Sequence, residues 1–177
     1  RNPNQENINL FEFTNGVDLD SHLFREEIAV QKAWILALNK IDKISDDEKS
    51  FLIETYDEIL QKMETNTFPW RIEDEDIHMN IERYITEKNS LVGKKIHLGR
   101  SRNDLIATTL RLYASNQISQ MQSHLKKFIS AALEHSKKNI DIIVPGLTHL
   151  QNGQPVRYSH AILGHVCSFL RDYQVLS

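Results

Sequence analysis

Apolar residues recur at intervals of three and four along most of the chain, a spacing that predicts amphipathic helices. A first stripe begins after Asp20 and predicts a helix of about five turns. Its members are Leu23, Ile28, Trp34, Ile35 and Leu38. A second helix is expected after Ser45, because SDDE at 45–48 offers an N-cap serine followed by acids in the first turn. Its apolar face consists of Phe51, Leu52, Tyr56, Ile59, Leu60 and Met63.

A third helix is predicted after the acidic run at 73–76. Phe68-Pro69-Trp70 interrupts the second helix, and Ile77, Ile81 and Ile85 form the next stripe. A run of like charges is usually a solvated face, but carboxylates also stabilise a helix N-terminus. We interpret the run ahead of His78 as a helix start rather than a metal site.

The longest stripe extends from residue 102 to about 138 without a proline or glycine. Its members are Ile106, Leu110, Tyr113, Gln117, Met121, Leu125, Phe128 and Ala132. The stripe predicts one helix of about 35 residues, roughly 50 Å long, that ends near Lys137-Lys138. A solvent-bridging helix fits poorly because the stripe is continuous, so a bundle with further helices or further chains is expected.

The rest of the pattern completes an all-α prediction. Val144-Pro145-Gly146 is a turn signal, Pro155 marks another break, and residues 158–177 form a further helix. No strand is required, and residues 1–12 are expected to be a polar arm. We predict a small helical N-terminal domain over residues 1–100 and the beginning of a helical-bundle domain over 101–177.

Composition narrows the function classes. The 177 residues have a formal net charge of −3, which argues against a nonspecific nucleic-acid binder. Cys167 is the only cysteine; it is expected to be a buried, inert thiol, and a reducing, cytoplasmic compartment is favoured. No run reaches the roughly 18 apolar residues of a membrane span, and the histidines have no metal-ligand spacing.

Candidate chemistry is densest at residues 93–113. Lys94, Lys95 and His97 lie between Gly93 and Gly99, and Arg100 and Arg102 follow. Ser101 and Asp104 have the spacing of a capping box. Glycines permit close backbone approach, and a helix N-terminus attracts anions. These residues predict a small site for a carboxylate; an ordinary solvated basic loop is the alternative.

Four collinear segments resemble the argininosuccinate lyase family, which includes the lens δ-crystallins. They are EDEDIHMNIERYITE at 73–87, KIH at 95–97, GRSRND at 99–104 and THLQNGQPVRYSH at 148–160. The resemblance extends from about Phe13 to the end of the chain. The superfamily's flexible G-S-S-x-M-P-x-K-x-N loop, which carries a catalytic serine downstream, is absent, so we expect an N-terminal portion that lacks activity alone.

The resemblance implies a reaction and an assembly. Enzymes of this family eliminate fumarate from argininosuccinate by acid/base catalysis and require no cofactor or metal. They form homotetramers whose active sites combine several chains. Their partners are small-molecule substrates, with no nucleic acid or membrane implied. A crystallin-like structural protein on the same scaffold, a related lyase acting on another amine–succinate adduct, and a helical interaction module are the alternatives.

The resemblance also assigns residues. His149 is the expected acid/base group, and Thr148 and Asn103 are expected to contact substrate. Arg102 and Ser101 are expected to bind carboxylate, unless Ser101 only caps the helix and Arg102 pairs with an acid. Supporting roles fall to His78, Glu82 and Gln154, and less strongly to Arg157.

Three residue pairs depart from the family pattern. Val30-Gln31 replaces a Gly-Ser pair whose serine contacts substrate, so Gln31 is assigned to the substrate site with an altered contact. His97-Leu98 replaces His-Thr, and Asn152-Gly153 replaces Arg-Ala. An alternative that these departures leave open is an altered substrate scope within the same elimination chemistry.

Overall fold

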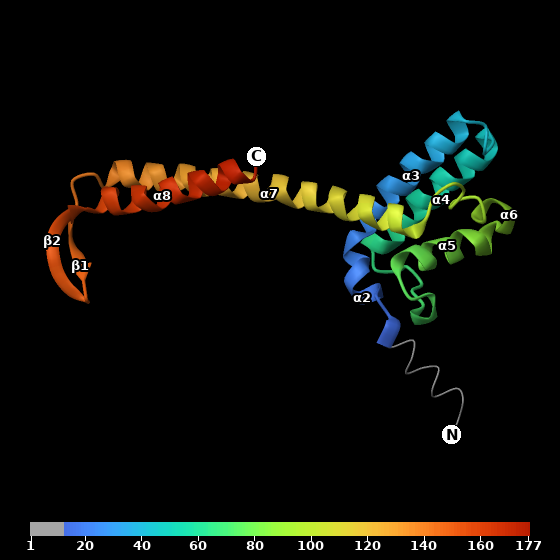
Figure 1. The fold of residues 1–177 in the computed structure, drawn as a ribbon, viewed down its shortest axis with the longest axis horizontal. Coiled ribbons are helices and arrows are strands. Elements are labelled where there is room, and N and C mark those ends of the chain that lie inside the picture. The colour runs from blue at the N-terminus through green and yellow to red at the C-terminus, as the bar shows by residue number, and fades with distance from the viewer. Residues whose placement is uncertain (1–12) are drawn as a thin grey trace, which may run out of the picture. The chain divides into compact units, whose positions relative to one another are not determined.

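The computed structural model describes residues 13–177; the polar arm predicted at 1–12 lies outside them. The chain divides into two compact units, Arg1–Tyr113 and Ala114–Ser177. In order, its elements are α2 (Val17–Asp20), the 3-10 helix η1 (Ser21–Leu23), α3 (Phe24–Lys40), α4 (Asp46–Glu64), the 3-10 helix η2 (Ile72–Asp74), α5 (Ile77–Lys88), α6 (Ser90–Gly93), α7 (Arg102–Lys138), β1 (Ile143–Thr148), β2 (Gln151–Arg157) and α8 (Tyr158–Val175). The all-α prediction is confirmed, with one small hairpin added (Figure 1).

The core of the first unit lies between α3, α4 and α5, whose predicted apolar stripes all face inward. Its buried residues include Ile28, Ile35, Leu38, Leu52, Tyr56, Ile59, Ile77, Ile81 and Ile85. Helix α4 begins as predicted: Ser45 Oγ accepts a hydrogen bond from the Glu48 amide, and Glu48 Oε2 accepts one from the Ser45 amide. This reciprocal capping box satisfies two amides that have no partner within the helix.

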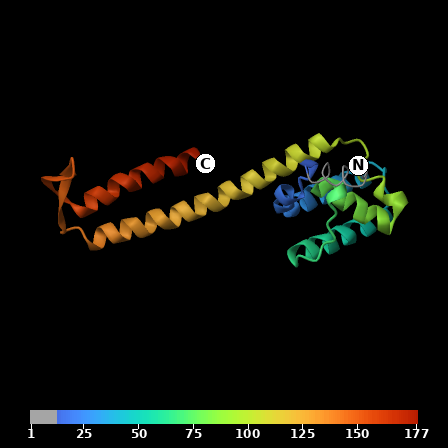
Figure 2. The same cartoon turned by 90° about the horizontal axis from the view of Figure 1, so that it is seen from below.

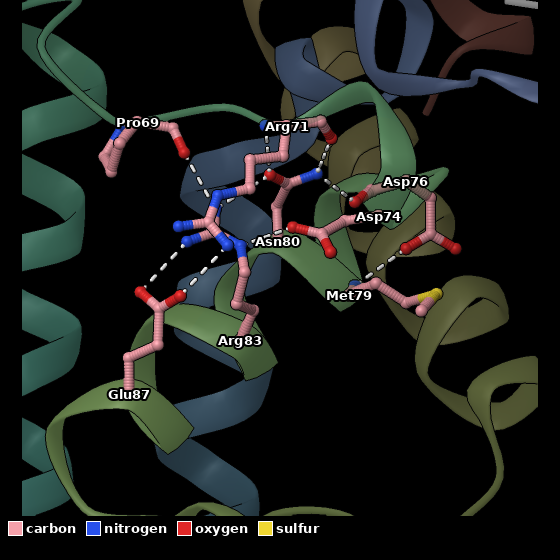
Figure 3. A network of polar contacts seen from close by, with 8 residues as sticks. All are labelled: Pro69, Arg71, Asp74, Asp76, Met79, Asn80, Arg83 and Glu87. Atoms are coloured by element: carbon pink, nitrogen blue, oxygen red, sulfur yellow. Dashed lines mark hydrogen bonds and ion pairs between the residues drawn. The ribbon is translucent and has the colours of Figure 1, made fainter. Parts of the chain in front are cut away.

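The segment that precedes α5 is held by a polar network around Arg83 (Figure 3). Arg83 Nε lies 2.5 Å from Asp74 Oδ2, and its Nη2 donates to the Pro69 carbonyl at 2.7 Å. Asn80 Oδ1 accepts from the Arg71 amide, and Asp76 Oδ1 accepts from the Met79 amide. The predicted helix start at 73–76 is therefore confirmed, with Asp76 as the N-cap of α5.

Helices α7 and α8 dominate the second unit, where α8 runs back beside the C-terminal part of α7 (Figures 1 and 2). The rings of Phe128 and Phe169 meet edge to face at 5.0 Å, and Gln122 Nε2 donates to the Leu176 carbonyl at 2.9 Å. The long helix is confirmed at 37 residues. The prediction of a buried Cys167 is wrong, because the thiol lies on an exposed face of α8.

The antiparallel pair β1–β2 corrects the prediction that no strand is needed. Pro145 and Pro155, interpreted as breaks between helices, lie opposite each other in the hairpin. A two-stranded sheet consists only of edges, where proline is tolerated. The register shifts between Pro145 and Leu147. There, a Cβ on Gly146 would approach the Gln154 carbonyl to 3.1 Å, so glycine permits this close backbone contact.

No helix among residues 13–177 combines the length and apolar character needed to cross a bilayer.

Gly93 serves packing, and substituting it tests this. A Cβ there would lie 2.4 Å from Thr86 Oγ1 and 2.8 Å from Thr86 Cα. Because backbone cannot yield easily, Gly93→Ala should lower the free energy of unfolding by about 1–3 kcal/mol. Gly164 in α8 meets nothing within 4 Å, so Gly164→Ala should be neutral or stabilise by up to about 1 kcal/mol. Urea titration of the two variants measures both effects; equal changes would refute the packing role.

Candidate active site

The cations expected to form an anion site are mostly paired with acids. Ile96 is 1% exposed and anchors the segment that joins α6 to α7. Gly99 follows with φ at +71°, the left-handed region that favours glycine. Two ion pairs join Lys95 Nζ with Glu48 Oε1 at 2.6 Å and Arg102 Nη1 with Asp76 Oδ2 at 3.0 Å. His97 Nε2 lies 2.9 Å from Glu82 Oε2. The solvated basic loop, the alternative to an anion site, therefore accounts for much of this run.

The capping box predicted at the start of α7 is formed. Asp104 Oδ2 accepts from the Ser101 amide at 3.0 Å, and the Asp104 amide donates to Ser101 Oγ at 3.4 Å. Hydrogen bonds from the Ser101 amide and hydroxyl lower the pKa of Asp104. A negative charge thus already occupies this helix end. Anion recognition by this turn must then depend on the side chains of Arg102 and Asn103, both exposed.

Arg102 pairs with an acid, one of the two roles considered for it. The two carboxylate oxygens of Asp76 have separate partners: Oδ1 caps α5 through the Met79 amide, and Oδ2 holds Arg102. The Arg102 side chain remains 41% exposed. Guanidinium carries five N–H donors, so most remain for a ligand while one is held by Asp76.

Behind this turn lies a buried polar centre around Glu27, whose side chain is fully buried. Gln31 Nε2 donates to Glu27 Oε1 at 2.8 Å, and Thr109 Oγ1 donates to Oε2 at 3.0 Å. His78 Nδ1 lies 3.0 Å from Oε1. Its N–H is not aligned with that oxygen, so the contact is chiefly an ion pair. Glu27 therefore joins side chains from α3, α5 and α7.

This centre changes how three predicted residues are understood. The structure brings Gln31 and His78 together through Glu27, a residue that the sequence analysis missed. The position of Gln31, three residues after Ile28 and four before Ile35 in an apolar stripe, was a signal that it is buried. Glu82 lies apart from the centre and pairs with His97.

The charge state of His78 follows from its surroundings. Burial lowers the pKa of His78, but the contact with Glu27 and the charges of Glu27, Asp76 and Asp20 outweigh it, so the pKa is raised. The net direction favours imidazolium beside carboxylate. A paired buried charge avoids the penalty of an isolated one.

Thr148 and His149 lie at the end of the β1–β2 hairpin. Thr148 pairs with Gln151, so only two residues form the turn. His149 and Leu150 have φ of 49° and 62°, the pattern of a type I′ turn, in which both central residues are left-handed. A left-handed backbone costs about 1–3 kcal/mol for each residue other than glycine. The side chains of Thr148, His149 and Leu150 are exposed.

Two more candidates, Gln154 and Arg157, lie on β2 of the hairpin. Gln154 is exposed on β2 opposite Gly146. Arg157 Nη1 donates to the Ile140 carbonyl at 2.8 Å and lies 3.5 Å from Asp141 Oδ1. Thr148, His149 and Gln154 thus belong to the second unit, and Ser101, Arg102 and Asn103 belong to the first.

No group of three or more His, Cys, Asp or Glu side chains within residues 13–177 is arranged to hold a metal ion. The chemistry available here is that of amides, hydroxyls, guanidinium and imidazole. A model of a lyase family matches residues 9–177, so the match covers nearly the whole of this chain.

The chain belongs to this lyase family. It is 38% identical over 165 residues to the argininosuccinate lyase of Acinetobacter baumannii, covering 93% of this chain and 35% of that protein. It is 37% identical over 164 residues to the argininosuccinate lyase of Chromohalobacter salexigens, with the same coverage. The chain thus spans about a third of the length of these curated relatives.

Two solved structures share the fold. A variant of EDDS lyase with bound fumarate superposes with a TM-score of 0.77 and 16% identity, covering 94% of this chain and 32% of that one. A fumarate lyase:delta crystallin from Brucella melitensis gives a TM-score of 0.72 at 17% identity, covering 88% of this chain and 39% of that one.

The buried pair of His78 and Glu27 predicts a pH-dependent stability in this lyase-family chain. Because the folded-state pKa of His78 is raised, its stabilising contribution is complete below the unfolded-state pKa of about 6.5. The contribution is lost as the pH rises through the folded-state pKa. Urea unfolding of wild type and His78→Gln across pH 5.5–9, chosen as roughly that window, should show the difference shrinking as pH rises. His160→Gln, which alters an exposed histidine of α8, should follow wild type. A pH-independent difference for His78→Gln would contradict the assignment.

Proposed function

We propose that the whole protein is an argininosuccinate lyase, which reversibly eliminates fumarate from argininosuccinate to give arginine. The observation that carries the proposal is the 37–38% identity to argininosuccinate lyases over 93% of this chain. The carbon–nitrogen lyase assignment rests on the same relatives.

The chemistry requires one base and one acid. The base removes a proton from the carbon beside a carboxylate, the C–H electrons form the new double bond, and the C–N bond breaks. The acid protonates the departing nitrogen, so protons balance without a redox cofactor. The intermediate carries extra negative charge on a carboxylate, which fixed donors stabilise.

We assign the acid/base role to His149, since imidazole changes charge near neutral pH. Its place in the hairpin supports this choice. Left-handed backbone at His149 and Leu150 carries a cost, and such strain concentrates at functional sites. Thr148, immediately before it, supplies a hydroxyl donor to a substrate carboxylate.

Asn103 and Arg102 bind the substrate from the first turn of α7. Asn103 offers an amide donor and acceptor, and Arg102 retains exposed N–H donors beside its contact with Asp76. Ser101 caps the helix and its hydroxyl already donates to Asp104, so a substrate carboxylate would replace Asp104 as the acceptor of that one proton. These side chains match what a carboxylate ligand requires.

We further propose that the active site combines several chains of a homotetramer. Ser101, Arg102 and Asn103 lie at the start of the 37-residue helix α7, and His149 comes after its end. A helix of that length measures about 55 Å at 1.5 Å per residue. The second unit also exposes large apolar side chains along its helices: Met121 52%, Phe128 53%, Leu133 37%, Leu163 39%, Leu170 43%. Surfaces of this kind mark protein interfaces.

A related lyase acting on another amine–succinate adduct is the second candidate. The observation that favours it is Gln31, which stands where family members have a substrate-contacting serine.

Replacing His149 tests the acid/base assignment. In the whole protein, His149→Ala should reduce turnover of argininosuccinate by about 10²–10⁴-fold, the range for loss of a positioned acid or base. Ultraviolet absorbance of the fumarate released measures turnover. His124→Ala, a change at an exposed position of α7, serves as the matched control. An active His149→Ala enzyme with an unchanged pH profile would remove His149 from the mechanism.

Combining two substitutions tests whether the separate motifs serve one substrate. Asn103→Ala should cost about 1.5–3 kcal/mol of transition-state or substrate binding, the value for a hydrogen bond to a charged group. If both side chains flank one substrate, the Asn103→Ala/His149→Ala defect should fall short of the product of the single defects. Steady-state kinetics on the three variants, with circular dichroism to verify folding, measures the coupling; fully multiplicative defects would indicate separate sites.

A further inference from the structure

We propose that Gln31 is a positioning residue whose amide joins Glu27 to Arg100 and thereby fixes the segment that leads into α7. Its Nε2 donates to Glu27 Oε1 at 2.8 Å, and its Oε1 accepts from Arg100 Nη2 at 2.6 Å. The two ends of one side chain thus connect a buried carboxylate with a guanidinium. The inference concerns how the substrate site is held, and its kinetic test rests on the proposed function.

Gln31 is too deeply buried for a substrate contact of the kind expected from its position. Its side chain is only 1% exposed, and its amide nitrogen and oxygen are each directed at an internal partner. Arg100 and Trp34 line a cavity of about 410 Å³ in the first unit, whose lining does not include Gln31. Any ligand in that cavity therefore meets Arg100, and Gln31 acts through it.

The length of the glutamine side chain is what makes the bridge. Serine ends one atom beyond Cβ, whereas the glutamine amide lies two bonds further and carries both a donor and an acceptor. Serine at this position could not place one polar atom near Glu27 and another near Arg100. The exchange of serine for Gln31 thus replaces a short hydroxyl by an internal connection between two charged side chains.

Arg100 transmits this connection to the candidate site. Its guanidinium lies 5.3 Å from the centre of the Trp34 ring, within range of a cation–π contact. The next three residues are Ser101, Arg102 and Asn103. Because Gly99 precedes Arg100 with a left-handed backbone, the chain turns here, and an anchored Arg100 limits how that turn can move. Gln31 therefore helps determine where the first turn of α7 presents its donors.

The test separates hydrogen bonding from packing. Gln31→Met keeps the length and approximate volume of the side chain but removes both hydrogen bonds. In the whole protein it should raise the KM for argininosuccinate by about 10–100-fold with a smaller change in kcat, as expected when a distant group misplaces binding residues. Gln61→Met, the same change at an exposed position of α4, should leave both constants unchanged. An unchanged KM in an active Gln31→Met enzyme would overturn the proposal.

A second readout does not require activity. The chain contains two tryptophans, Trp34 and Trp70, so a Trp70→Phe background leaves Trp34 as the only reporter. Loss of the bridge should free Arg100 from the ring and increase acrylamide quenching of Trp34 in Gln31→Met but not in Gln61→Met. Equal quenching in the two variants would show that Gln31 only fills space.

Arg100→Lys keeps the test decisive if Gln31→Met folds poorly, since it preserves the charge of a half-buried side chain. It should raise KM by a similar factor, and an unchanged KM in Arg100→Lys would overturn the proposal. Where both single variants fold, the Gln31→Met/Arg100→Lys variant should be no worse than either single one, because both changes remove the same connection. Independent, multiplicative effects would contradict the bridge. A wild-type enzyme inert toward argininosuccinate would refute the proposed function, while the Trp34 measurement would still decide the role of Gln31.

Discussion

The buried carboxylate of Glu27 is the constraint on which the rest of the first unit depends. A charge removed from water is costly unless it is paired and hydrogen-bonded. Glu27 meets this demand with one partner from its own helix, Gln31, one from α5, His78, and one from α7, Thr109. Because the three partners come from three helices, satisfying one carboxylate sets the relative positions of those helices. The positions of residues near the start of α7 therefore depend on the contact between Thr109 and Glu27.

Contacts with carboxylates also determine the polar surface of the segment before α7. Lys95, His97 and Arg102 each contact a carboxylate, so the positive run in the sequence does not produce a broad positive field. The hydrogen-bond donors that remain for a ligand are the exposed ones on Arg102 and Asn103. Such a site suits a small carboxylate, whose recognition depends on a few directed hydrogen bonds rather than on long-range charge. This agrees with the mildly acidic composition of the chain.

Helices and their starts could be predicted from the sequence, because they depend on local chemistry. The uninterrupted stripe after residue 102, the serine of SDDE and the Ser101–Asp104 box all occur where expected. The hairpin was missed because Pro145 and Pro155 indicate breaks, and only their pairing across two strands accommodates them. The burial of Gln31 was missed although its place between Ile28 and Ile35 indicated it, and its contact with Arg100 was missed because the two residues are 69 positions apart. Pairing of distant polar groups leaves little local trace in a sequence.

We propose that the first turn of α7 and the β1–β2 hairpin serve one substrate and are supplied by different chains of an assembly. A crystal structure of the whole protein with fumarate tests this most directly. We expect one fumarate in contact with Asn103 of one chain and with Thr148 and His149 of another, with Gln31 still joined to Glu27 and Arg100. Fumarate bound away from Asn103, or at Asn103 with no hairpin beside it, would refute a shared substrate site.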